Sequence, residues 1–332
     1  MKWFVTGSTG FLGRHLVAAL RRRGDDVVAL CRKPDADLAA QGATLVLGDV
    51  MDGPSVRAAA AGCDGAFHCA GKVSREEADA EAMFRVHVEG TKLTLDALKE
   101  AGVRRVVYAS TSGTVAISED ASDVRDEGAS TPTELLARWP YYRSKLYAEQ
   151  VALERNVADF AVVSVNPSLL LGPGDVHGSS TEDVRKFLER KIPFAPGGGI
   201  AFVDARDAAE ALVLAMDRGA AGERYLINAA NMSLGAFFGR LERMSGVKAP
   251  DLRLPRTGAT LAGLSADLLG RAAKLLGAPK PLDKVSAEMA QYFWYCSAAK
   301  AERELGWTAR DPNETLADTI ADLRERGVVW PG

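Results

Sequence analysis

A phenol and an amine stand four residues apart at Tyr141 and Lys145, in a segment whose apolar residues recur with helical periodicity. Residues at this spacing lie about one turn apart on the same face of a helix. A lysine ammonium close to a tyrosine lowers the pKa of the phenol, which makes the tyrosine a usable proton donor or acceptor near neutral pH. The pair therefore predicts an acid–base function for the tyrosine.

A glycine-rich turn near the start of the chain lies between a predicted strand and an amphipathic helix, and reads Thr6-Gly7-Ser8-Thr9-Gly10-Phe11-Leu12-Gly13. Glycines permit a tight turn and the close approach of backbone to ligand, and the helix N-terminus favours the negative charge of a pyrophosphate. The alternative is a glycine-rich turn that binds nothing. Together with the Tyr–Lys pair, the turn indicates hydride chemistry on a dinucleotide.

The end of the second predicted strand distinguishes NAD from NADP, because an acid there binds ribose hydroxyls whereas a cation accommodates the 2′-phosphate. This chain has Arg32 and Lys33 at that place, with no acid before Asp35. The two cations favour NADP(H), and a solvated basic turn is the alternative. After the third strand, Asp49 and Val50 are placed to meet the adenine amino group, although Asp49 equally fits a helix or turn cap.

Short apolar runs alternate with helical patterns through the first half of the chain. Parallel strands need crossover helices, so the alternation predicts an α/β fold with a Rossmann-type, doubly wound parallel sheet. The expected strands are 3–6, 27–30, 44–47, 66–69, 103–109 and 161–165, and a helix is expected at 141–153.

The pattern changes after Pro167, where glycine and proline mark loops at 172–175 and 196–199. The sequence predicts a dinucleotide-binding domain at 1–166. It also predicts a smaller C-terminal lobe at 167–332 that is mainly substrate-binding and returns some segments to the main sheet. The elements expected in this lobe are helices near 207–216, 234–244 and 261–276, and a strand at 225–227.

The composition is that of an ordinary soluble enzyme: 332 residues, 47% hydrophobic and 26% charged, with a formal net charge of -3. There is no basic tract to support nucleic-acid binding. The first residues lack the charged and apolar regions of a secretory signal, so we expect a cytoplasmic protein.

The apolar stretch at 261–276 contains three charged residues, which indicates an amphipathic helix rather than a membrane span. The four cysteines have no metal-ligand spacing, so we expect buried thiols in a reducing compartment and no metal site.

Motifs along nearly the whole chain resemble those of the extended short-chain dehydrogenase/reductase family, or NAD-dependent epimerase/dehydratase family. Within it, the chain is similar to the branch of dihydroflavonol reductases, 3β-hydroxysteroid dehydrogenases and bacterial epimerase-like proteins. The motifs are TGSTGFLG at 6–13, GDV at 48–50, FHCAG at 67–71, VEGT at 88–91, YASTSGTV at 108–115, YYRSK at 141–145, NPSLLLGPGD at 166–175, FVDARD at 202–207 and KAERELGW at 300–307.

The resemblance implies that Tyr141 is the catalytic acid/base, since it stands four positions before Lys145. Tyr142 has the wrong spacing and is expected to pack or to line the site. Lys145 would hold the nicotinamide ribose hydroxyls. The family's catalytic serine falls on Thr111, whose hydroxyl can still donate to a substrate carbonyl. The alternatives for this position are Ser110 and Ser112.

The motifs and the resemblance together imply the cofactor and substrate contacts. Arg14, after the third glycine, would either reach the 2′-phosphate or be solvated. The expected cofactor contacts are Gly7, Thr9, Gly10, Phe11, Leu12, Gly13, Arg32, Lys33, Asp49, Val50, Ala70, Gly71, Tyr141, Lys145, Pro167 and Ser168. The expected substrate contacts are Ser112, Gly113, Leu169 and His177, with Val176, Phe187 and the 261–276 helix as further lining candidates.

Three positions depart from the family pattern. His87 stands where many relatives have an asparagine that supports the catalytic lysine, and it is either a proton relay or a satisfied core histidine. Ala116 replaces the asparagine of dihydroflavonol reductases, which argues against a flavonoid substrate. The segment at 199–201 lacks the arginine with which nucleotide-sugar epimerases clamp the substrate pyrophosphate.

These features predict an NADP(H)-dependent oxidoreductase, with NAD(H) as the alternative cofactor, that interconverts a ketone and a secondary alcohol. The substrate is expected to be a moderately hydrophobic small molecule, and a homodimer is typical of the resemblance. One alternative is a sugar or nucleotide-sugar epimerase with tightly bound NAD(H). The other is a non-catalytic dinucleotide-sensing protein.

Overall fold

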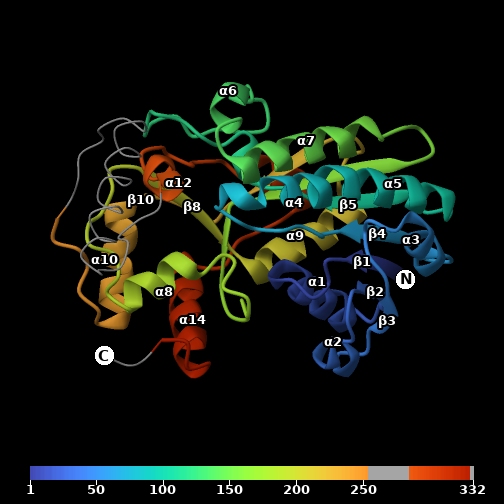
Figure 1. Cartoon of the computed structure of the whole chain (residues 1–332), viewed down its shortest axis with the longest axis horizontal. Coiled ribbons are helices and arrows are strands. Elements are labelled where there is room, and N and C mark those ends of the chain that lie inside the picture. Colours follow the sequence, from blue (N-terminus) through green and yellow to red (C-terminus); the bar gives the residue numbers. More distant parts are fainter. Residues whose placement is uncertain (253–283, 330–332) are drawn as a thin grey trace.

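The computed structural model describes residues 1–252 and 284–329 of the chain. The predicted helix at 261–276 lies outside the described residues. Figure 1 shows a large sheet flanked by helices and, beside it, a smaller lobe that contains α8, α10 and α14.

The main sheet has seven strands in the order β3-β2-β1-β4-β5-β6-β9, and every neighbouring pair is parallel. This confirms the Rossmann-type, doubly wound sheet. The strand order reverses between β1 and β4, and ligands of such sheets bind outside the carboxyl ends of the strands at that point. The strands are β1 (Lys2–Thr6), β2 (Asp26–Cys31), β3 (Thr44–Leu47), β4 (Gly65–His68), β5 (Arg105–Ala109), β6 (Ala161–Pro167) and β9 (Arg224–Ile227).

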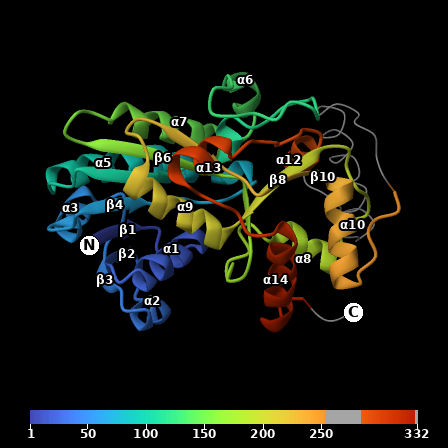
Figure 2. The same ribbon diagram turned by 180° about the vertical axis from the view of Figure 1, so that it is seen from behind.

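Helices cover both faces of the sheet, as Figures 1 and 2 show from opposite sides. One face carries α1 (Phe11–Arg22), α9 (Ala205–Arg218) and α13 (Ala299–Leu305). The other face carries α3 (Gly53–Ala60), α5 (Gly90–Glu100) and α7 (Pro140–Glu154). A short α2 (Ala36–Ala40) joins β2 to β3.

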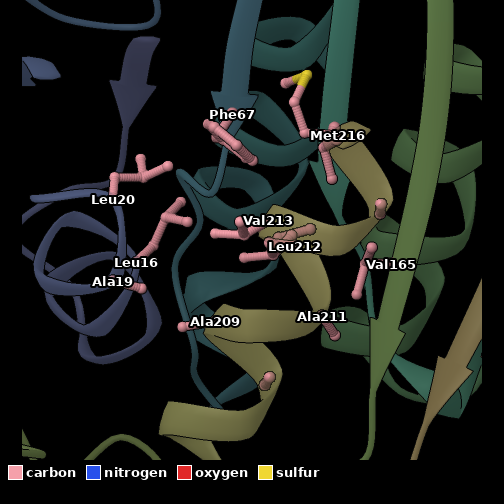
Figure 3. Close-up of a cluster of buried hydrophobic side chains, with 14 of the residues drawn as sticks. Leu16, Ala19, Leu20, Phe67, Val165, Ala209, Ala211, Leu212, Val213 and Met216 are labelled. Carbon is pink, nitrogen blue, oxygen red and sulfur yellow. The ribbon is translucent and has the colours of Figure 1, made fainter. Parts of the chain in front are cut away.

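The helices α1 and α9 pack against each other on one face of the sheet (Figure 3). Leu16 and Leu20 of α1 and Leu212 of α9 have no exposed surface. Full burial of a leucine side chain contributes roughly 1.5–3 kcal/mol relative to exposure. This apolar cluster packs α1, whose first residues complete the glycine turn, against α9 and the sheet.

The segment before α5 forms α4 (Ala80–Phe84) and then a π-helical turn, η2 (Arg85–Glu89). Turns of this kind occur frequently at functional sites. His87 lies in this turn, which packs against α7. The widened turn therefore places His87 beside the helix of Tyr141 and Lys145.

The smaller lobe contains a second sheet in the order β10-β8-β7. Its helices enclose an apolar core that includes Phe187, Phe202 and Phe237. The elements of this lobe are β7 (Leu169–Leu171), β8 (Gly199–Asp204), β10 (Ala230–Ser233), α8 (Glu182–Leu188), α10 (Leu234–Ser245) and α14 (Pro312–Glu325). The remaining short elements are η1 (Glu77–Asp79), η3 (Ser112–Thr114), α6 (Thr133–Leu136) and α12 (Lys284–Met289).

Most predicted strands and helices agree with the observed ones to within two residues at each end. One difference is β6, which continues through Pro167 instead of ending at Val165, because Pro167 is in register with Ile227 of β9. The strand β9 lies after residue 167 in the sequence and joins the main sheet, as expected for a segment that returns to it. The domain boundary at 166 stays a prediction. In the described residues, no helix is both long and apolar enough to cross a membrane.

Candidate active site

The glycine turn lies tightly against the start of the loop that follows β4. Gly7 has a φ of +67°, and a Cβ atom there would lie 2.5 Å from the backbone of Cys69. A Cβ atom at Gly13 would overlap the carbonyl of Gly7. Larger residues at these two positions would push α1 away from the sheet, so the close approach requires glycine.

The N-terminus of α1 suits an anionic group. The helix follows Gly10, has no side-chain cap and carries no acidic residue in its first turn. Its first backbone N–H groups therefore lack side-chain acceptors, and the helix dipole favours negative charge at this end. The turn thus fits the pyrophosphate of a dinucleotide, and Thr9, Phe11 and Leu12 lie in or beside it.

The end of β2 presents two exposed cations. Arg32 and Lys33 are exposed, and neither forms an ion pair with any residue in 1–252 or 284–329. Arg14 is neither solvated nor free, because its guanidinium lies 2.5 Å from Asp35 Oδ2 and 3.3 Å from Asp37 Oδ2. The sequence predicted either a phosphate contact or a solvated side chain for Arg14. The structure instead shows an ion pair with two aspartates.

Asp49 and Val50 follow β3 at the same edge of the sheet. The Asp49 carboxylate accepts the backbone N–H of Met51 at 2.9 Å, which fits the turn-cap alternative. Val50 is buried and packs against the core between the sheet and α3.

Lys145 is buried against the end of β5. Its Nζ atom donates to the hydroxyl of Tyr108 at 2.9 Å and to the carbonyl of Ala109 at 2.7 Å. Burial lowers the pKa of Lys145 to about 8, and the nearby Glu149 carboxylate opposes this shift. The lysine is therefore anchored by the strand that leads into the Thr111 loop.

The expected effect of Lys145 on Tyr141 does not appear in this structure. Burial raises the pKa of Tyr141 above its usual value, and the neighbouring Tyr142 adds to the rise. The expectation was wrong because the Lys145 ammonium donates to β5, while the Tyr141 ring lies against the rings of His87 and Tyr142. Tyr141 is accordingly a protonated phenol near neutral pH.

His87 joins the loop after β4 to α7. Its Nε2 atom accepts the backbone N–H of Lys72 at 2.9 Å, and its Nδ1 atom lies 2.8 Å from the hydroxyl of Ser144. The Ser144 hydroxyl also donates to the carbonyl of Tyr141 at 2.8 Å. Burial lowers the pKa of His87 to about 3. The geometry is that of a satisfied core histidine, and its ring packs edge-on against Tyr141.

Of the three hydroxyl candidates in the loop after β5, only one has a proton without an acceptor among the described residues. Ser110 is buried and donates to Glu149, and Ser112 is buried and hydrogen-bonds to the thiol of Cys296. Thr111 is partly exposed, and its hydroxyl accepts the backbone N–H of Gly113 at 3.3 Å. That contact leaves the hydroxyl proton of Thr111 unused.

The remaining cofactor candidates lie at the carboxyl ends of neighbouring strands. Ala70 and Gly71 follow β4, and Pro167 and Ser168 stand at the end of β6. A Cβ atom at Gly71 would lie 3.2 Å from the His87 ring. The sheet order therefore gathers these positions at one edge, together with Thr111 after β5.

Tyr142 has aromatic neighbours that sequence reasoning missed. Its ring stacks on Trp294 with centroids 4.7 Å apart and packs edge-on against Trp139. A Cβ atom at Gly113 would overlap the Tyr142 ring, so η3 lies directly against this stack. The run Tyr292-Phe293-Trp294-Tyr295, unusual in a chain with 7% aromatic residues, was the available signal.

The expected substrate contacts of the smaller lobe are of two kinds: some pack in or against its core, and others are exposed. Phe187 is fully buried in the core of the lobe and stacks on Phe238, so it is not a lining residue. Leu169 packs partly against the same core. Val176 and His177 lie exposed on the loop before α8.

A family model for the NAD dependent epimerase/dehydratase family matches residues 3–228. The chain belongs to this family. Two relatives named as reductases are similar to it along nearly their full length. A Synechocystis sp. protein provisionally named a dihydroflavonol 4-reductase is 34% identical, covering 98% of this chain and 96% of its own. A Stigmatella aurantiaca protein named as a ketoreductase of a farnesylated dihydroquinoline oxide is 31% identical, covering 100% and 98%.

Solved structures agree with this membership of the epimerase/dehydratase family. The crystal structure of gox2253 has a TM-score of 0.81 and 28% identity, covering 99% of both chains. A dTDP-glucose 4,6-dehydratase from Streptomyces venezuelae, solved with NAD bound, has a TM-score of 0.75 and 23% identity, also covering 99% of both chains. At that identity the second likeness supports the fold alone.

Proposed function

We propose that this protein is an NADP(H)-dependent oxidoreductase that interconverts a ketone and a secondary alcohol. The observation that carries the proposal is the division of roles among three polar residues around β5. Tyr141 and Thr111 each keep a partly exposed side chain with an O–H proton to donate, and Lys145 is buried behind them. The reductase names of the full-length relatives support the same class of reaction.

In the reduction direction, the hydroxyl groups of Thr111 and Tyr141 would both donate hydrogen bonds to the substrate carbonyl oxygen. When bound, the nicotinamide would supply the hydride for the carbonyl carbon. As the C=O bond electrons move to oxygen, Tyr141 gives that oxygen its proton, so that no free alkoxide forms. The raised pKa of Tyr141 suits this direction, because it keeps the phenol protonated near neutral pH.

The residues around the glycine turn would hold the dinucleotide. The N-terminus of α1 fits the pyrophosphate, and Arg32 and Lys33 supply two exposed positive charges for a 2′-phosphate. Lys145 would hold the ribose hydroxyls of the nicotinamide half, since its three protons exceed the two acceptors that β5 provides.

The smaller lobe favours reduction over sugar-nucleotide epimerisation. The segment where such epimerases carry a clamping arginine is here Gly199-Ile200-Ala201, at the start of β8. The aromatic stack of Tyr142 and Trp294 instead offers apolar ring surface beside the Thr111 loop. We infer a moderately hydrophobic ketone as the substrate.

The test is Tyr141→Phe, measured by NADPH oxidation over a panel of aromatic and alicyclic ketones. Loss of the general acid should reduce turnover by at least roughly a hundredfold while NADPH still binds. The matched control is Tyr142→Phe, which removes a hydroxyl from the adjacent ring and should change turnover only a few-fold. Wild-type turnover in Tyr141→Phe would contradict the assignment.

A further inference from the structure

A buried carboxylate, Glu149, lies one helical turn beyond Lys145 on α7 and has no place in the reaction as described above. Its side chain is only 1% exposed. Burying a charge is costly unless hydrogen bonds and an opposite charge compensate it. The partners of Glu149 therefore show what the buried charge is used for.

Three of these partners come from the loop after β5 and from the end of β6. The Glu149 Oε2 atom accepts hydrogen bonds from the hydroxyl of Ser110, from the hydroxyl of Thr114 at 2.9 Å and from the amide of Asn166 at 2.8 Å. The other carboxylate oxygen lies 3.1 Å from Arg224 Nε on β9. One side chain thus ties α7 to β5, β6 and β9.

The same cluster fixes the backbone of Thr111. The Asn166 amide that donates to Glu149 also lies 3.1 Å from the carbonyl of Thr111. Ser110 and Thr114, the two hydroxyl donors to Glu149, flank Thr111 in the loop. The backbone N–H of Thr114 closes the turn on the Thr111 carbonyl at 3.2 Å.

We propose that Glu149 is a positioning residue that holds the Thr111 hydroxyl in line with Tyr141 for donation to the substrate carbonyl. This inference rests on the proposed function. A carboxylate suits the task because it only accepts hydrogen bonds, and every group that faces it is a donor. Its place on α7, eight residues after Tyr141, makes the helix of the proton donor and the loop of the second donor one rigid unit.

The primary test is Glu149→Gln, which keeps the shape of the side chain. A glutamine must turn its amide protons toward either Arg224 or the three loop donors, so one set of donors loses its acceptor. Because small misplacements of reacting groups cost up to about 100-fold, we expect kcat to fall by roughly 10-fold or more with little change in the KM for NADPH. The matched control is Glu127→Gln, which alters a partly buried carboxylate elsewhere in the fold that accepts the backbone N–H of Leu226.

A double-mutant cycle with Thr111→Val separates positioning from general destabilisation. If Glu149 acts through the Thr111 hydroxyl, Glu149→Gln should lower kcat hardly any further in the Thr111→Val background. If Glu149→Gln lowers kcat by the same factor in the Thr111→Val background as in wild type, Glu149 is merely structural and the proposal is wrong. Should Glu149→Gln fail to fold, Thr114→Val, which removes one link between Glu149 and the loop, takes its place in the same cycle.

Wild type and Tyr141→Phe are measured in the same series, so that the two proposals can fail separately. Ketone reduction that survives Tyr141→Phe, or its absence in wild type, overturns the proposed function and with it the role of Glu149. Reduction that depends on Tyr141 but changes less than about twofold in Glu149→Gln, where a misplaced group should cost far more, overturns the role of Glu149 alone.

Discussion

The Nδ1 atom of His87 lies 2.8 Å from the hydroxyl oxygen of Ser144, the residue immediately before Lys145. Since Nε2 accepts a hydrogen bond from the Lys72 backbone N–H, the ring proton must lie on Nδ1, which donates a hydrogen bond to the Ser144 hydroxyl oxygen. The Ser144 hydroxyl in turn donates a hydrogen bond to the Tyr141 carbonyl. His87 therefore links the loop after β4 to the first turn of α7.

Replacing His87 by leucine should destabilise the protein by roughly 1–3 kcal/mol, because the buried N–H of Lys72 loses its acceptor. Urea unfolding followed by fluorescence would measure the loss as a lower midpoint at unchanged slope. Ser144→Ala is the control for the other end of the link and should cost about 1 kcal/mol. An unchanged midpoint for His87→Leu would show that the bridge contributes nothing.

Two buried histidines should make the protein sensitive to acid. The pKa values of His68 and His87 are both lowered to about 3, chiefly by burial, from an ordinary value of 6.5. Between pH 6.5 and 3 the unfolded chain binds more protons than the folded one, so stability falls as pH falls through this window. Each histidine contributes up to about 1.4 kcal/mol per pH unit there.

This pH dependence can be measured by thermal unfolding of wild type and His68→Gln between pH 7 and 5. His68 bridges Thr6 at 2.7 Å and Thr91 at 3.0 Å, and glutamine keeps polar atoms there without a titrating ring. The variant should lose less stability than wild type on acidification. Parallel curves would mean that His68 does not titrate on unfolding.

The ammonium of Lys145 should set the alkaline limit of activity. Its pKa is lowered to about 8, so its positive charge is lost as pH rises through that value, and ketone reduction should decline over the same range. The raised pKa of Tyr141 keeps that group from titrating in this range. A profile of kcat/KM from pH 6 to 10 would locate the inflection.

Tyr108→Phe should move this inflection to lower pH, because it removes a hydrogen-bond acceptor that favours the charged form of Lys145. Tyr225→Phe is the matched control, since its hydroxyl contacts Ala220 and Glu304 on β9's side of the sheet and not the lysine. The interpretation fails if both variants keep the wild-type profile.

Arg32 and Lys33 should determine the choice of cofactor. Changing both to serine should raise the KM for NADPH by at least roughly tenfold, the cost of losing a charge-assisted hydrogen bond to phosphate, and leave the KM for NADH nearly unchanged. Arg22→Ser, an exposed cation at the far end of α1, controls for the loss of charge. Equal stabilisation of wild type by NADP⁺ and NAD⁺ in a thermal-shift titration would argue against this role.

The sequence by itself determined the features that depend on local spacing. Strand and helix periodicity identified the parallel sheet, and the glycine turn lay where a strand meets a helix. The interval between Tyr141 and Lys145 put both on one helix, α7. These features follow from neighbouring residues along the chain, because period and turn chemistry are local properties.

Only the tertiary structure decided how distant polar groups divide their hydrogen bonds. Lys145 donates to β5 and not to Tyr141, and Arg14 pairs with Asp35 across 21 positions of sequence. Glu149 gathers donors from two strand ends that no local pattern relates to α7. Burial and partner choice depend on which strands become neighbours in the sheet, and this neighbourhood sets the pKa values of the site.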